Sequence, residues 1–166
     1  MPTAGEEKHT MKLLFTILII IASPVVTAHE FAQKNITVDH PWSKPTPPLS
    51  EYGVAYFNVS NSGQTDDLLL EIIIPDEIAK SASIHDVIHD GEMMRMREVT
   101  NGKKIPRGST IKFQPGGSHI MLEGLPKPLK LDDKFTIELI FENAGNVLVE
   151  IWVEDAPQQC DKHHNH

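Results

Sequence analysis

Apolar and polar positions alternate along most of the chain from residue 36 to residue 154, in short stretches separated by turn-forming residues. This alternation is typical of β-strands with one buried face, and no stretch keeps a helical repeat over a useful length. The pattern predicts nine strands, at Ile36–Asp39, Val54–Ser60, Leu68–Ile74, Ser83–His89, Met93–Val99, Thr110–Gln114, His119–Leu122, Lys134–Glu142 and Val147–Glu154.

Nine short strands at this spacing predict one all-β domain, an antiparallel Greek-key β-sandwich. The stretch from Pro41 to Pro48 is rich in proline, so we expect a rigid extended linker outside the central hydrogen-bond ladder. Glycine-containing turns separate the strands, at Asp90-Gly91, Asn101-Gly102, Pro115-Gly116-Gly117 and Ala144-Gly145-Asn146. Of these, Asp90-Gly91 and Ala144-Gly145-Asn146 are typical of hairpin loops.

The two ends of the chain differ from this central part. Met11-Lys12, an uncharged apolar run and then Val26-Thr27-Ala28 have the order of a secretory signal peptide. We therefore expect residues 1–28 to be a signal peptide, with an over-extended start in 1–10, residues 29–156 to form the sandwich, and residues 157–166 to be a flexible tail. The leader predicts a periplasmic protein, and the lack of Cys at the cleavage point argues against a lipid anchor and stable membrane association.

Net charge, cysteine content and the lack of catalytic motifs make several classes of function less favoured. A net charge of −8 disfavours nucleic acid as a partner, because phosphates would be repelled. Cys160 is the single cysteine, so the chain cannot form an internal disulfide and its core alone must hold the fold. No Ser-His-Asp arrangement, phosphate loop or carboxylate pair predicts an enzyme.

Two histidines and two methionines carry the most informative chemistry. His119 and Met121 are two apart on a predicted strand and share a face, and the Asp90-Gly91 hairpin would place His85 opposite Met96. Four of the six methionines lie within this region of the chain. Imidazole and thioether donors are neutral and soft, and soft sulfur ligands select Cu(I). These residues therefore predict a Cu(I) site.

The spacing resembles that of the periplasmic copper chaperones often called PCuAC. Ten residues separate His85 from Met96, and twenty-two lead on to His119-Ile120-Met121, one more than the usual family spacing. Further similarity lies in Pro41-Trp42-Ser43-Lys44-Pro45, Ala55-Tyr56-Phe57, Pro115-Gly116-Gly117 and Gly124-Leu125. The resemblance covers nearly the whole predicted domain.

This resemblance implies a cupredoxin-like sandwich that binds Cu(I) through His85, Met96, His119 and Met121. It also implies delivery of copper to a receiving protein, either a cytochrome oxidase subunit or another copper chaperone. Family members often carry a second methionine just after the first histidine, where this chain has Asp86 and Val87. An auxiliary ligand at that place is therefore absent.

Several other residues are weaker candidates for binding metal. His89 and Met94 lie on the predicted hairpin, and a tail rich in imidazole could take Cu(II) through Cys160, His163, His164 and His166. If cleavage follows Ala28, the amino-terminal His29 could also chelate Cu(II), although most cleavage sites leave arbitrary residues.

Two other functions are consistent with parts of this pattern. A copper storage or detoxification protein would use the same ligands and differ only in lacking a recipient. A blue-copper electron carrier would need a Cys thiolate with two His ligands. Cys160 lies in the polar tail, where no following strand would fix its geometry, so this alternative is the weaker.

Overall fold

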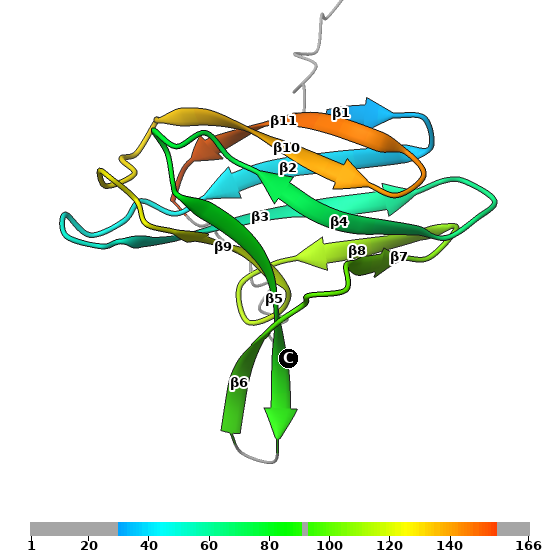
Figure 1. The fold of residues 1–166 in the computed structure, drawn as a ribbon, viewed down its shortest axis with the longest axis horizontal. Helices are drawn as coiled ribbons and strands as arrows, with labels where there is room; N and C mark the ends of the chain where they lie inside the picture. The colour runs from blue at the N-terminus through cyan, green and yellow to red at the C-terminus, as the bar shows by residue number, and fades with distance from the viewer. Residues whose placement is uncertain (1–29, 91–92, 156–166) are drawn as a thin grey trace, which may run out of the picture.

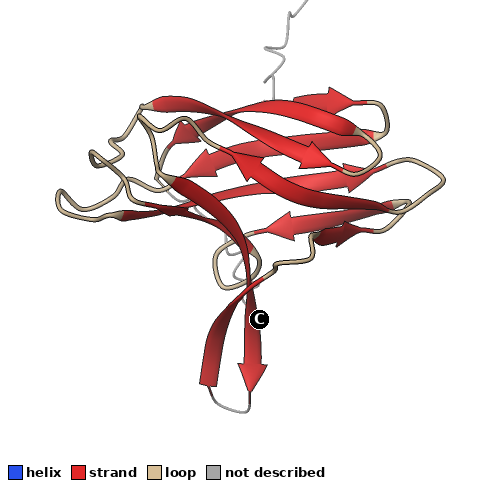
Figure 2. Ribbon diagram, viewed as in Figure 1, coloured by secondary structure: helices blue, strands red, loops and turns tan. Residues whose placement is uncertain are grey.

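A computed structural model of the protein describes residues 30–90 and 93–155, and it is all-β, as predicted (Figures 1 and 2). The described residues form no helix, and so none that could cross a membrane. Eleven strands replace the nine predicted: β1 Glu30–Gln33, β2 Ile36–Ser43, β3 Tyr52–Asn61, β4 Asp67–Ile73, β5 Ser81–Asp90, β6 Met93–Glu98, β7 Lys103–Ile105, β8 Ser109–Phe113, β9 His119–Glu123, β10 Lys134–Phe141 and β11 Gly145–Val153.

The strands follow one continuous path of hydrogen-bonded neighbours, β6-β5-β9-β3-β2-β11-β10-β4-β7, with β1 paired to β2 and β8 paired to β3. Neighbouring strands are antiparallel, except that β11 runs parallel to β2. The path closes on itself, because β4 also lies against β5, and β7 lies against β3 and β8. Neighbours far apart in the sequence, such as β3 and β9, give the crossed connections expected of a Greek-key sandwich.

The apolar face of each alternating strand supplies the core between the layers. Phe57 of β3 and Phe113 of β8 meet inside it, with ring centroids 4.7 Å apart. Aliphatic side chains from the central strands surround these rings, among them the fully buried Val38, Val59, Leu69, Ile120, Leu122, Leu139, Val149 and Ile151. With no disulfide in the chain, burial of this apolar surface is the main source of stability.

The prediction of a proline-rich linker is wrong at its start, because Pro41, Trp42 and Ser43 belong to β2. The register with β3 shifts between Asp39 and Trp42, and His40 takes a left-handed φ of 49°. A bulge of this kind tolerates proline, since a residue inside it need not donate a ladder hydrogen bond. Trp42 then pairs with Tyr56 of β3 and Trp152 of β11.

Two strands were missed because they are too short for a periodic pattern. β1 has four residues and lies on β2, and β7 has three residues, Lys-Lys-Ile, and lies on β4. Alternation over three or four positions cannot be told from chance, and two adjacent lysines do not suggest a buried element. β7 nevertheless places Ile105 in the core and Lys103 close to β5.

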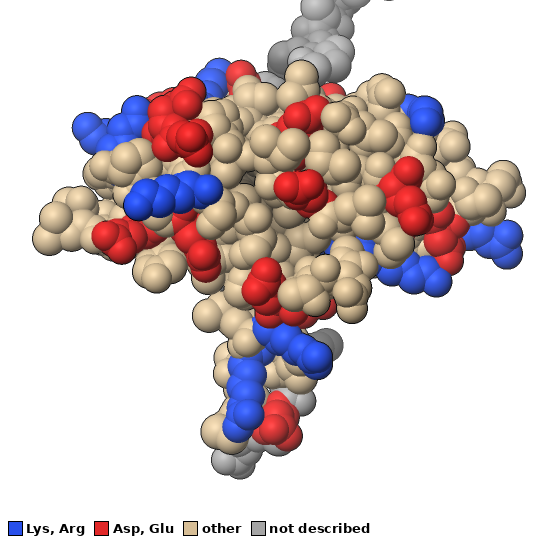
Figure 3. Space-filling view, in the orientation of Figure 1, with Lys and Arg blue, Asp and Glu red and all other residues tan. Residues whose placement is uncertain are grey.

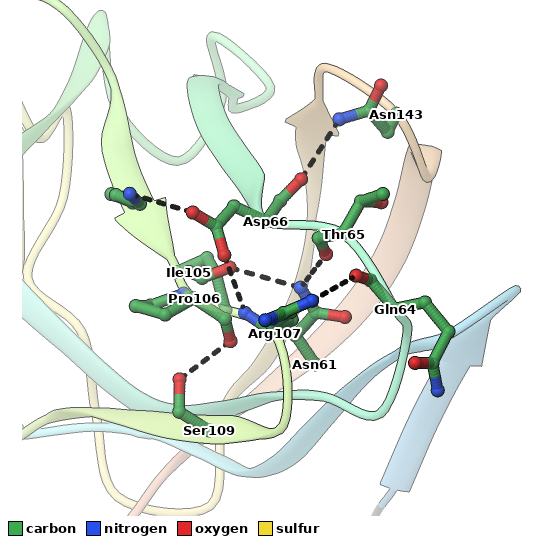
Figure 4. Close-up of polar contacts among 10 residues, drawn as sticks. Asn61, Gln64, Thr65, Asp66, Ile105, Pro106, Arg107, Ser109 and Asn143 are labelled. Atoms are coloured by element: carbon green, nitrogen blue, oxygen red, sulfur yellow. Dashed lines mark hydrogen bonds and ion pairs between the residues drawn. The ribbon is translucent and has the colours of Figure 1, made fainter.

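A polar cluster joins the loop after β3 to the turns that follow β7 and β10 (Figure 4). The amide of Asn61 donates to the carbonyls of Thr65 and Ile105, at 2.9 and 3.0 Å. The carboxylate of Asp66 accepts from the backbone N–H of Arg107 at 2.9 Å. The hydrogen bond from Lys104, followed by that from Arg107, holds the pKa of Asp66 below its usual value.

The neighbouring Asp67 is buried and serves as the anchor of the β10–β11 loop. Its carboxylate accepts hydrogen bonds from the backbone N–H groups of Leu68, Asn143 and Ala144, at 2.8 to 2.9 Å. Only 5% of Asp67 is exposed. Because buried N–H groups need partners, this one side chain holds the β10–β11 loop against the start of β4.

We expect Asp67→Ala to lower the free energy of unfolding by about 2–4 kcal/mol, since it leaves buried N–H groups unpaired. Urea unfolding followed by tryptophan fluorescence would measure the loss. Asp66→Ala is the matched control, because Asp66 is the adjacent, solvent-exposed aspartate. Equal losses in the two variants would show that Asp67 is not the anchor described.

Candidate metal centre

The second half of β5, from His85 to Asp90, and the whole of β6 form an arm that projects from the sandwich (Figures 1 and 3). β5 pairs with β9 from Ser81 to His85, and with β6 from His85 to Asp90. His85 is therefore the residue at which β5 leaves the body of the sheet. All residues of β6 are exposed, so this strand presents its side chains to solvent.

The turn before β9 places His119. Gly116 takes a left-handed φ of 77°, which glycine adopts without strain. The turn is closed by the N–H of Gly117 donating to the carbonyl of Gln114 at 3.0 Å, and by the N–H of Gln114 donating to the carbonyl of Ser118 at 2.8 Å. The predicted Pro115-Gly116-Gly117 turn thus delivers Ser118 and His119 to the start of β9.

Three of the four predicted ligands lie together on one face of β5 and β9. His85 pairs directly with His119, and Ser83 pairs with Met121. Ile84, Ile120 and Leu122 alternate with them and are buried in the core, so the predicted ligands face the other side. The two imidazole rings are stacked, with centroids 5.7 Å apart and planes 25° apart.

The predicted pairing of His85 with Met96 is wrong by two residues. His85 lies opposite Glu98, and Met96 lies opposite Val87. The reason is the position of the turn: Asp90 is still paired, with Met93, so the hairpin closes one residue later than the Asp90-Gly91 pattern suggested. Met96 remains on the same face as His85, as its diagonal neighbour, a separation that long side chains can bridge.

Hydrogen bonds to the two imidazoles differ. Nδ1 of His119 lies 3.0 Å from the carbonyl oxygen of Gly117. A carbonyl can only accept, so Nδ1 carries the proton and Nε2 of the neutral ring keeps a free lone pair. In His85, Nε2 lies 3.0 Å from the hydroxyl of Ser83, and the buried Nδ1 has no hydrogen-bond partner among the described residues. Nε2 of His119 can therefore offer a lone pair, and His85 can offer Nδ1 in the tautomer in which its Nε2 donates to Ser83.

The exposed fraction of the four predicted ligands increases from the sheet to the arm. His119 is 6% exposed, His85 and Met121 are half-buried, and Met96 is 62% exposed. The described residues contain no group of three or more His, Cys, Asp or Glu side chains placed to hold a metal ion.

The weaker candidates are only partly within the described residues. Met94 lies on the same face as Met96, is 68% exposed and pairs with His89 in the arm. Residues 1–29, with the predicted signal peptide and His29, lie outside the described part of the chain. So does the predicted tail, with Cys160, His163, His164 and His166.

A charged group behind the candidate site was not predicted. Asp86 follows His85, and its carboxylate accepts hydrogen bonds from Lys103 of β7 and from Ser118. Burial alone would raise the pKa of Asp86, but the hydrogen bonds from Lys103 and Ser118 and the nearby charge of Lys103 outweigh it and lower the pKa. Sequence spacing gives no signal for this contact, since the three residues belong to separate elements.

The chain is similar to several known proteins. Residues 36–153 match the family described as "LpqE-like: Putative lipoprotein LpqE-like". A protein of Leifsonia xyli subsp. xyli named "Putative lipoprotein Lxx21020" is 33% identical over 101 residues. That alignment covers 61% of this chain and 60% of the relative, so the chain matches less than two thirds of the relative's length.

Two solved structures extend the comparison to the fold. The copper-bound PCuAC domain from PmoF2 has a TM-score of 0.64 and 25% sequence identity, covering 77% of this chain and 99% of that domain. The Cu(I) form of DR1885 from Deinococcus radiodurans has a TM-score of 0.54 and 26% identity, covering 69% of this chain and 74% of that protein. The resemblance to PCuAC domains that the sequence indicated is thus confirmed.

The hydrogen bond to Gly117 predicts the tautomer of His119. We expect the neutral ring to carry its proton on Nδ1 in the metal-free protein, because a carbonyl oxygen cannot donate. Long-range ¹H–¹⁵N correlation spectra of the imidazoles would assign the protonated nitrogen. A ring protonated on Nε2 would mean that the lone pair faces the carbonyl and that this nitrogen is not free for a metal.

Proposed function

The chain belongs to the LpqE-like family, and we propose that its sandwich binds copper as Cu(I) and hands it to a receiving protein. The observation that carries the proposal is the pairing of His85 with His119, with Met121 beside them on the same face of β9. Similarity to the copper-bound PCuAC domain from PmoF2 supports copper as the cargo. The ligands proposed are His85, Met96, His119 and Met121.

The oxidation state follows from the donors. Two imidazoles and two thioethers bring no negative charge, and thioether sulfur is a soft donor that suits Cu(I). Glu98 lies opposite His85 on the same face, but its side chain is exposed and hydrated. The similar fold of the Cu(I) form of DR1885 supports the same assignment.

Carriage requires that the ion can leave as well as bind. Buried His119 and half-buried His85 and Met121 would hold the ion at the sheet, whereas Met96 stands on the exposed arm. A partner that supplies its own soft ligand could displace Met96 first and then take the ion from the remaining donors. This order favours transfer between proteins over permanent storage.

The recipient proposed is a cytochrome oxidase subunit or another copper chaperone. We place the transfer in the periplasm, after removal of residues 1–28. The naming of the Leifsonia xyli relative as a lipoprotein is consistent with export. A transfer assay from the loaded protein to a soluble copper-binding oxidase domain would separate carriage from storage or detoxification, because a storage protein would retain the metal.

An anaerobic Cu(I) titration against a chromophoric chelator tests the site. We expect one tight equivalent in the protein without residues 158–166, and at least tenfold weaker binding in Met121→Leu and in Met96→Leu. Leucine has nearly the volume of methionine but no sulfur, so folding should be unchanged.

Met93→Leu is the matched control for Met96→Leu. The two methionines lie on the same strand and are similarly exposed, at 56% and 62%, but Met93 is on the opposite face of β6. The control should bind Cu(I) like the unaltered domain. Unchanged affinity in both Met96→Leu and Met121→Leu would reject the His-Met site.

The tail is proposed as a separate site for Cu(II), held by His163, His164 and His166 with Cys160. Imidazole suits Cu(II), and a tethered site would raise the local copper concentration near the sandwich. Truncation after Pro157 should leave Cu(I) binding unchanged and reduce the Cu(II) stoichiometry measured by calorimetry. Equal Cu(II) stoichiometry with and without the tail would remove this part of the proposal.

A further inference from the structure

Asp86, Lys103 and Ser118 form a closed triangle of hydrogen bonds behind the candidate copper ligands. The ammonium of Lys103 lies 2.7 and 2.8 Å from the two carboxylate oxygens of Asp86 and 3.0 Å from the hydroxyl of Ser118. The Ser118 hydroxyl donates in turn to Asp86 at 2.6 Å. Each side chain contacts both of the others.

The triangle joins the two points of the chain that carry the histidines. Asp86 is the residue after His85 on β5, and Ser118 is the residue before His119 at the start of β9. Side chains of adjacent strand residues point to opposite faces, so the triangle lies on the reverse side of the strands from the imidazoles. Lys103 connects both to β7, a third element of the sandwich.

The position of the triangle matters because the sheet divides there. Pairing between β5 and β9 ends at His85 with His119, and beyond His85 the strand β5 continues into the arm, paired with β6. Asp86 is thus the first residue of β5 outside the pairing with β9. A bond from Asp86 to Ser118 continues the connection between β5 and β9 by side chains where the backbone ladder stops.

We propose that Asp86, Lys103 and Ser118 are positioning residues, a clamp that sets the separation of His85 and His119 for Cu(I). The proposal rests on the copper-binding function proposed above. The clamp restrains rotation of the arm about His85, so that the two imidazoles and Met96 are already arranged before the ion arrives. Groups that orient metal ligands without touching the metal commonly change affinity by tenfold or more.

A second ion pair made by β7 is an ordinary surface contact and can be compared with the Lys103–Asp86 pair. Lys104 lies 2.7 Å from Asp66, but the two side chains are 63% and 44% exposed, against 19% and 32% for Lys103 and Asp86. Exposed pairs of this kind contribute little, because water competes for both charges. Lys104 therefore provides a matched control, one residue away, with the same charge.

The test is Cu(I) affinity in Lys103→Leu, measured in the full chain with the competition titration. Leucine removes the charge without adding a sulfur that could bind Cu(I). Charge alone predicts tighter binding, because a positive charge near a cation site is removed. The clamp predicts the opposite, a loss of tenfold or more. Lys104→Leu removes the same charge from the same strand and should bind Cu(I) as the unaltered protein does, and Lys103→Arg should restore most of the affinity.

Two further measurements separate positioning from a general loss of stability. X-ray absorption of the Cu(I) form should show two nitrogen and two sulfur ligands in the unaltered protein and fewer ligands or greater disorder in Lys103→Leu. Ser118→Ala, which leaves every charge in place, should weaken Cu(I) binding in the same direction. This second variant also serves if Lys103→Leu does not fold.

The outcomes distinguish the clamp from the function on which it rests. If the unaltered protein binds no Cu(I), the proposed function fails. If the unaltered protein binds Cu(I), but Lys103→Leu and Ser118→Ala bind it equally or more tightly with the same absorption spectrum, the clamp is overturned. Weaker binding in both variants, with Lys104→Leu unchanged, supports it.

Discussion

The pairing of β5 with β9 is the constraint on which the candidate site depends. Ile84, Ile120 and Leu122 are buried, and a shift of either strand by one residue would bring polar residues into the core. The register that satisfies the core also places His85 opposite His119 and leaves Met121 on the same face. The hydrophobic effect therefore makes the main contribution to holding the two imidazoles in place. It comes from the buried residues that alternate with them along β5 and β9.

The site combines a rigid part with an exposed part. The sheet, the turn at Gly116 and the hydrogen bond from His119 to Gly117 restrain the imidazoles, whereas Met96 stands on an arm that leaves the sandwich. The proposed carrier role needs both properties, since a fully enclosed ion would exchange slowly and a fully exposed one would bind weakly. The triangle of Asp86, Lys103 and Ser118 lies at the boundary between the two parts.

Residue pattern alone predicted the all-β class and the common face of His119 and Met121, because both depend on alternation over several positions. It failed where local context decided the structure. The bulge at His40 admits Pro41 to a strand, a turn placed one residue later changes the partner of His85, and β7 is too short to show a period. The contact of Lys103 with Asp86 depends on tertiary packing, so no spacing rule would have found it.

The exposed methionines of β6 are also open to oxidation. Met93, Met94 and Met96 are each more than half exposed, whereas Met121 is half-buried and His119 is buried. Peroxide converts a thioether to a polar sulfoxide, which no longer offers the soft sulfur lone pair that suits Cu(I). Oxidant would therefore reach the arm before the sheet, and Met93 and Met94 would consume part of it beside Met96. In the proposed copper site, oxidation would therefore remove the sulfur donor on the arm while leaving the core and the paired imidazoles in place.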